Sequence, residues 1–243
     1  AIHSVMNCRR LGFEYLHFNP KLDLVARLHE YLSRNCSQEL ICLGSEEDVF
    51  CSSYIEQAEK FLIENNDYTS YIGRYITLGK PFLGLNRLVH GRDYITRLDL
   101  SHSDPILRLI SLLQSILVGC SPVFFAARRR TQLLQSLEAQ MKVKYESTQE
   151  LVDQVYLALN GKFRFVEQPM LMRDETNIGY KFYESRHHPE VYLTQMDFKR
   201  IRSLVSRDFK IKNLELGLDI IENMWSPMDL SLIHISEPTR PNC

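Results

Sequence analysis

The chain has 243 residues, of which 44% are hydrophobic and 24% are charged, a composition typical of one large globular domain or two small ones. Its formal net charge of −1 supplies no basic field for nucleic acid, and no apolar run reaches the roughly 18 residues of a membrane span. The six cysteines form neither a CxxC pair nor a His/Cys metal-ligand spacing, and Cys42 and Cys51 are typical of small core residues in a reducing compartment.

The first predicted elements are a strand and an amphipathic helix. Residues 11–18 alternate loosely between apolar and polar side chains, which predicts a strand. Asn19 and Pro20 are a favourable N-cap and first helical residue. Apolar residues at helical spacing then predict a helix that ends near Arg34.

An acidic turn follows the next predicted strand. The apolar run 40–43 ends at Gly44 and leads, after Ser45, into three consecutive carboxylates, Glu46, Glu47 and Asp48. In open α/β sheets, ligands bind beyond the carboxyl ends of the strands. Unpaired carboxylates are almost never buried, so the turn is either a solvated loop or a cation site.

Alternating helices and strands then predict a layered α/β sheet with right-handed crossovers. Residues 53–64 form an amphipathic helix, and residues 68–78 form a strand rich in tyrosine, threonine and isoleucine. From residue 79 to residue 103, glycines and scattered charges indicate a loop or short pairing strands. This β–α–β–α–β order is the basis of the predicted layered sheet.

The next predicted elements are a helix that opens at Asp104-Pro105, a strand over residues 122–127 and a helix over residues 131–142. The strand ends in the basic triplet Arg128-Arg129-Arg130. Such a triplet is either the solvated start of a helix or a phosphate-binding group at a strand end.

The next helix opens with a predicted capping box, Ser147 followed three residues later by Glu150, and ends at Gly161. Two strand-like pieces follow, residues 162–166 and residues 170–173. Helices are then predicted over residues 194–205 and 213–223.

The last residues differ in kind from the rest of the chain. Residues 230–240 resemble the translation of a transposon-derived sequencing adaptor, so we expect residues 230–243 to be non-native. The predicted organisation is therefore a core over residues 1–175, a helical extension over residues 176–229 and a non-native tail.

Three stretches together resemble glycosyltransferase family 2, whose members have the GT-A fold. Residues 40–50 are similar to an apolar strand that runs into a "DDDF"-like acidic turn, and residues 58–75 are similar to a "FLENNPDY…HGRY" continuation. Glu150, the Gly161-Lys162 turn and Arg173 match the spacing of an acidic helix start, a "GK" turn and an arginine at a strand end. The resemblance implies a GT-A-like mixed α/β sheet, with the family's first strand missing from this chain.

The resemblance also implies an inverting glycosyltransferase that moves a sugar from a nucleoside-diphosphate sugar to a saccharide or lipid-linked acceptor. Asp48 would be a ligand of Mg²⁺ or Mn²⁺, and Glu46 would contact the ribose or the metal's water shell. Glu47 and Arg173 would line the same donor site. Hard cations of this kind prefer oxygen ligands and act as Lewis acids for a departing diphosphate. The resemblance further implies a cytoplasmic location, with peripheral membrane association as an open alternative.

An inverting transferase also needs a general base to take a proton from the acceptor hydroxyl. The matching position is Glu150, and Asp153, one helical turn further on, is the reserve base. The alternative role for Glu150 is purely structural, because a capping-box glutamate bonds the backbone of its own helix.

Two other functions stay open. Glu46 and Glu47 stand where the family usually has aspartate, so the chain could be a non-catalytic carbohydrate- or nucleotide-binding relative that has lost the metal. A nucleotidyltransferase has a similar sheet order and acidic site, but it is expected to carry a glycine-rich basic turn that this sequence lacks.

Overall fold

The computed structural model describes residues 18–19, 21–44, 48–78, 100–118, 123–144, 146–174 and 195–225. The chain divides into two compact units, Ala1–Ser37 and Gln38–Cys243. The strand predicted over residues 11–18, most of the loop predicted over residues 79–103 and the tail over residues 230–243 lie largely or wholly outside the described residues.

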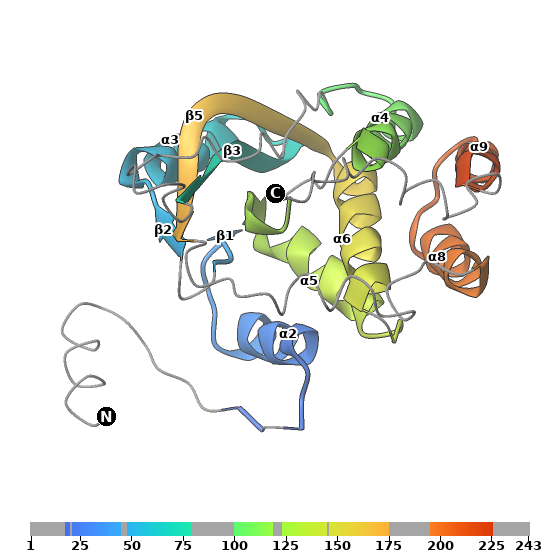
Figure 1. Ribbon diagram of the computed structural model, residues 1–243, viewed down its shortest axis with the longest axis horizontal. Helices are drawn as coiled ribbons and strands as arrows, with labels where there is room; N and C mark the ends of the chain where they lie inside the picture. The colour runs from blue at the N-terminus through green and yellow to red at the C-terminus, as the bar shows by residue number, and fades with distance from the viewer. Residues whose placement is uncertain are drawn as a thin grey trace, which may run out of the picture. The chain divides into compact units, whose positions relative to one another are not determined.

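In the first unit, the described helix is α2, Leu24–Arg34 (Figure 1). Asp23 is its N-cap, and the Asp23 carboxylate accepts a hydrogen bond of 2.8 Å from the backbone N–H of Ala26. The prediction that Asn19 is the N-cap was wrong. The Asn19 side chain instead accepts a hydrogen bond from the N–H of Lys21, which forms a turn before the helix.

The second unit contains a mixed five-stranded sheet, so the predicted α/β class is confirmed. Its strands are β1 (Leu40–Ile41), β2 (Asp48–Phe50), β3 (Tyr68–Leu78), β4 (Ala127–Arg129) and β5 (Lys162–Asp174). The spatial order is β1-β4-β3-β5-β2. Only the β3–β5 pair is parallel, and the other three pairs are antiparallel.

The two long strands form a bent ribbon in the middle of the sheet, and β5 curves strongly along its length (Figure 1). Their register shifts between Ile72 and Arg74, which lies opposite Pro169. Proline cannot donate to a ladder and is tolerated at such irregularities. The sequence predicted two separate strand pieces at this point, whereas the structure has one strand that bends.

Seven described helical segments accompany the sheet. They are α3 (Ser52–Glu64), α4 (Pro105–Val118), the short 3-10 helix η2 (Val123–Phe125), α5 (Arg130–Gln140), α6 (Glu146–Asn160), α8 (Gln195–Asp208) and α9 (Leu214–Trp225). The predicted start of α4 is confirmed, because the Asp104 carboxylate accepts a 2.8 Å hydrogen bond from the N–H of Ile106. The strand predicted over residues 122–127 was wrong in its first part. The N–H of Ala126 bonds to the carbonyl of Val123 in a helical turn, and β4 begins only at Ala127.

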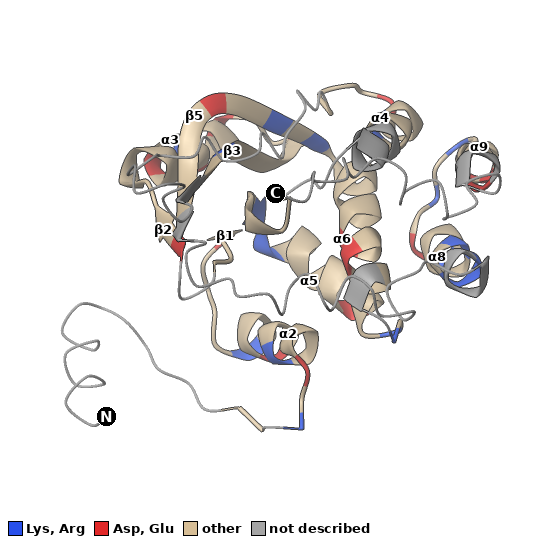
Figure 2. Ribbon diagram, viewed as in Figure 1, with Lys and Arg blue, Asp and Glu red and all other residues tan. Residues whose placement is uncertain are grey.

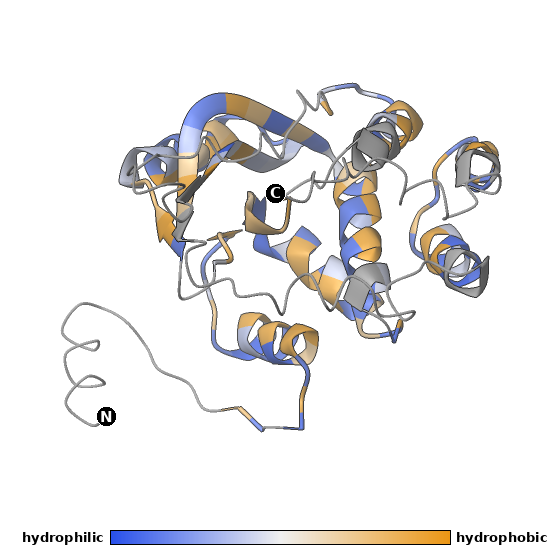
Figure 3. Cartoon of the chain, viewed as in Figure 1, coloured by the Kyte–Doolittle hydropathy of each residue, from blue (hydrophilic) through white to orange (hydrophobic). Residues whose placement is uncertain are grey.

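α6 lies centrally among the helices of this unit, and it contacts α4, α5, α8 and the sheet (Figure 1). Apolar colour recurs on its successive turns (Figure 3), and most of its residues from Leu151 to Leu159 are buried. α9 packs on α4 through Gly217, where an added Cβ would lie 2.9 Å from the Ile106 side chain. The second unit therefore continues across the boundary expected near residue 175.

Candidate functional site

The acidic turn connects opposite margins of the sheet. β1 and β2, which flank the turn in the sequence, are the outermost strands in the spatial order of the sheet. Glu46 and Glu47 lie outside the described residues, whereas Asp48 is the first residue of β2. The third carboxylate of the turn thus belongs to a strand.

The two ends of this turn are packed against each other. A Cβ added at Gly44 would lie 2.7 Å from the Phe50 ring, so the glycine backbone touches that ring. Phe50 in turn is partly buried against the hydrophobic core. Directly after β2, the N–H of Cys51 donates a 2.9 Å hydrogen bond to the carbonyl of Met170, which ties the turn to β5.

The sheet brings two of the predicted site residues together. Asp48 is the register partner of Arg173 in the antiparallel β2–β5 pair. Arg173 lies near the carboxyl end of β5, where its backbone also pairs with Thr77 of β3. Two positions far apart in the sequence therefore occupy adjacent strands at one edge of the sheet.

This edge is formed by strand ends that share one direction. β3 and β5 are parallel, and β4 is antiparallel to both β1 and β3, so β1 points the same way as β3. The carboxyl ends of β1, β3 and β5 therefore face one side, which we call the carboxyl edge. It is the edge at which ligand sites of α/β sheets are expected.

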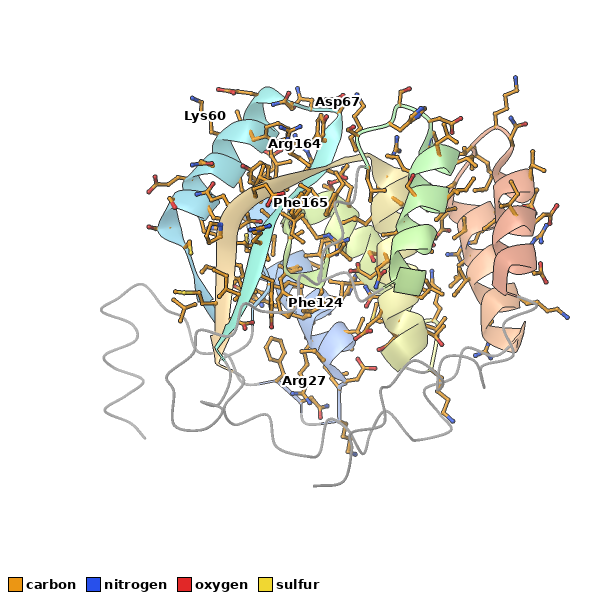
Figure 4. The ribbon with its side chains drawn as sticks, turned by 45° about the horizontal axis from the view of Figure 1, so that its top comes forward. Arg27, Lys60, Asp67, Phe124, Arg164 and Phe165 are labelled. Atoms are coloured by element: carbon orange, nitrogen blue, oxygen red, sulfur yellow. The ribbon has the colours of Figure 1, made fainter. Side chains whose placement is uncertain are left out.

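Lys162 lies at the other edge, at the amino end of β5. Its ammonium is 2.6 Å from the Asp67 carboxylate, and this hydrogen bond lowers the pKa of Asp67 and raises the pKa of Lys162. Figure 4 shows Asp67 and Arg164 at this end of the ribbon, whereas Phe124 of η2 lies further toward the other end. In Figure 2, the blue segments of β5, which mark lysine and arginine, lie in the half of the strand that follows α6. Lys162 and Arg173 therefore cannot serve one site.

The first two arginines of the basic triplet are neither a solvated helix start nor an accessible phosphate-binding group, because they are the last residues of β4 and point into the interior. Arg128 and Arg129 are both buried. The Arg129 guanidinium donates to the carbonyls of Leu62 and Tyr68, at the end of α3 and the start of β3, and to the Glu39 carboxylate at 2.9 Å. It thus satisfies a free carbonyl of a helix end.

Arg128 forms a buried ion pair with Asp153, the reserve base expected from the sequence. Its Nη1 donates to both carboxylate oxygens, at 2.7 Å and 2.8 Å, and both side chains are at most 4% exposed. The Ser136 hydroxyl donates to the same carboxylate at 2.6 Å, and Gln140 does so at 3.3 Å. Asp153 therefore joins β4, α5 and α6.

Glu150 lies one turn before Asp153 on α6, and its side chain is exposed. The predicted capping box was wrong in its N-cap, because α6 begins at Glu146 and Ser147 already belongs to the first turn. Ser147 therefore cannot be the N-cap that a capping box joins to Glu150.

The sequence reasoning missed the partnership of Arg128 and Asp153. A signal was present: Asp153 follows Leu151 and Val152 and precedes Val155 and Tyr156, in the stretch 151–159, which is otherwise mostly apolar. A charged residue in such surroundings is buried only when it is paired. The sequence could indicate that a partner exists, but not which arginine it is.

Among the residues that the structure describes, no group of three His, Cys, Asp or Glu side chains is suited to hold a metal ion. Cys42, between β1 and Gly44, is partly buried against the core, and burial raises the pKa of its thiol to about 12. It therefore stays protonated at neutral pH and packs as a core residue.

None of the helices in the described ranges has the length and the apolar character needed to cross a membrane. No protein-family model matches the chain, and no curated protein shows significant similarity to it.

Proposed function

We propose that this chain derives from an inverting glycosyltransferase that transfers a sugar from a nucleoside-diphosphate sugar to a saccharide or lipid-linked acceptor. The observation that carries the proposal is the pairing of Asp48 with Arg173 at the carboxyl edge of the sheet. The acidic turn and the strand-end arginine were assigned to one donor site from separate parts of the sequence, and this pairing supports that assignment.

The chemistry of these residues suits a diphosphate with a divalent cation. Carboxylates repel a diphosphate directly, but Asp48 and Glu46 together offer the oxygen ligands that Mg²⁺ or Mn²⁺ prefers. Such a cation, when bound, stabilises the charge that develops on the leaving diphosphate. Glu47 and Arg173 would complete the donor site, with the arginine bringing positive charge to the phosphate oxygens.

The acceptor proton would go to Glu150. A general base must be able to reach the acceptor hydroxyl, and Glu150 is exposed on α6. Asp153 is less suited to this role, because its carboxylate accepts hydrogen bonds from Arg128, Ser136 and Gln140 in the interior. Within the proposal, the reserve base is therefore a structural residue.

The proposal places the enzyme in the cytoplasm, with peripheral membrane association where the acceptor is lipid-linked. The non-catalytic alternative rests on Glu46 and Glu47, whose longer side chains replace the usual aspartates of the acidic turn. The two candidates differ in metal dependence, since only the first requires a divalent cation.

Calorimetric titration of the chain with UDP and with GDP, with and without Mn²⁺, tests the proposal. We expect Mn²⁺-dependent binding of one nucleotide, and we expect Asp48→Ala to weaken it at least about tenfold, because a cation ligand is lost. Asp67→Ala is the matched control, since Asp67 is an exposed aspartate at the opposite edge that pairs with Lys162. If Asp48→Ala binds the nucleotide as tightly as the original chain, the donor site does not lie at the acidic turn. Binding without metal would favour the non-catalytic alternative.

A further inference from the structure

The buried ion pair links the two parts of the proposed site. Arg128 is the register partner of Ile41 in β1, and β1 leads directly into the acidic turn. Asp153 lies on α6, three residues after Glu150. A short path of contacts therefore runs from the strand before the acidic turn, through the ion pair, to the helix that carries the proposed base.

α6 has a second polar anchor, but it is remote from Glu150. The Arg108 side chain donates hydrogen bonds to the carbonyls of Ala158, at 2.8 Å, and Leu159, at 3.4 Å, in the last turn. With a rise of 1.5 Å per residue, Ala158 lies about 12 Å along the axis from Glu150, whereas Asp153 lies about 4.5 Å away. The ion pair is thus the nearer of these two anchors to the proposed base.

Stability alone does not explain the polar groups around Arg128. Its Nε and the hydroxyl of Ser70, its register partner in β3, are buried and have no hydrogen-bond partner among the described residues. Unsatisfied buried groups cost stability, and a buried ion pair is often no more stabilising than apolar residues of similar size. A role in specifying where the helix sits therefore explains the ion pair better than stability does.

We propose that Arg128 and Asp153 are positioning residues, which set α6, and with it Glu150, relative to the acidic turn. The catalytic consequence rests on the function proposed above, but the positional claim does not. Each side chain is buried, so neither is expected to touch the substrate.

The positional claim is tested by a distance measurement. Spin-labelled unnatural amino acids at Val49 and Glu150, both exposed, report the separation between β2 and α6 by pulsed electron paramagnetic resonance. The double variant Arg128→Met/Asp153→Leu replaces the pair with apolar residues, which is expected to preserve folding. We expect its distance distribution to shift or broaden by at least about 1.5 Å, the rise of one helical residue.

Leu62→Ala, a cavity-forming change in the interior of α3, is the control for general destabilisation and should leave the distribution unchanged. An unchanged distribution in the folded double variant would overturn the proposal. So would an equal change in Leu62→Ala, because the effect would then follow from lost stability.

A kinetic readout separates this inference from the proposed function. Release of UDP or GDP from UDP-glucose, UDP-N-acetylglucosamine and GDP-mannose is measured with a panel of sugar acceptors. We expect kcat to fall about 100-fold in the double variant, with the KM for the donor unchanged, because a base displaced by about 1 Å works poorly. If the original chain releases no nucleotide, the proposed function fails, while the distance measurement still decides the positioning role.

Discussion

At the scale of single residues, two glycines permit the close packing of the bent ribbon, because they have no side chain. A Cβ added at Gly73 would lie 2.5 Å from the carbonyl oxygen of Gln168 and 2.8 Å from the Cβ of Met170. A Cβ added at Gly161 would lie 2.4 Å from the Thr69 side chain. Both glycines therefore bring β3 and β5 together, and Gly161 serves packing as well as the end of α6.

Gly73→Ala should destabilise the protein by about 1–3 kcal/mol, because the neighbour that must move is a backbone carbonyl within the ribbon. Urea unfolding followed by circular dichroism measures the change.

Gly217→Ala is the matched control for this prediction. Its Cβ would meet only the Ile106 side chain, and alanine favours the helix by about 1 kcal/mol, so the net change should lie within about 0.5 kcal/mol. Equal losses in both variants would show that the bend has no special packing demand.

At the scale of elements, buried arginines join segments that no strand pairing connects. Arg129 links β4 to the end of α3, and Arg108 links α4 to the end of α6. In each case the guanidinium donates to carbonyls that have no partner within their own helix. These side chains act as helix caps supplied from a distant part of the chain.

Arg129→Met should therefore lower the free energy of unfolding by about 3 kcal/mol, since several buried carbonyls lose a charged donor. Thermal and urea unfolding provide the measurement.

Arg74→Met is the comparison, because Arg74 pairs with Glu167 at 2.7 Å but both side chains are about half exposed. An exposed pair contributes at most about 1 kcal/mol. A loss for Arg129→Met no larger than that for Arg74→Met would contradict the capping role.

At the scale of the whole molecule, the main hydrophobic cluster defines what must be present for folding. It contains Ile201, Leu204 and Val205 of α8, and Leu214 and Leu218 of α9. Val25 and Leu32 of α2 are buried but do not belong to it. The two last described helices therefore contribute to the main hydrophobic cluster.

A chain limited to residues 38–243 should unfold cooperatively, because it contains every residue of the cluster. A chain limited to residues 1–174 should lose at least about 5 kcal/mol, because five buried apolar side chains of the cluster are removed. The expectation is contradicted if the fragment 1–174 unfolds cooperatively with the same free energy of unfolding as the full chain.

Much of the local structure was predictable because it depends on neighbours in the sequence. Helical spacing predicted α3 nearly to the residue, and β-branched and aromatic residues predicted β3 over Tyr68–Leu78. The helix starts at α2 and α6 were less predictable. Two suitable caps lie close together before α2, and the turn at Asn19 competes with the cap at Asp23.

The candidate site was predictable only as a set of residue types. A strand that runs into three carboxylates indicates a loop or a cation site wherever it occurs, and the sequence determined that much by itself. Only the tertiary structure decided that Asp48 lies opposite Arg173, that Lys162 lies at the other edge, and that Asp153 is bound to Arg128. The physical reason is that caps and periodic patterns act within a few residues, whereas strand order and buried ion pairs are chosen by packing among distant segments.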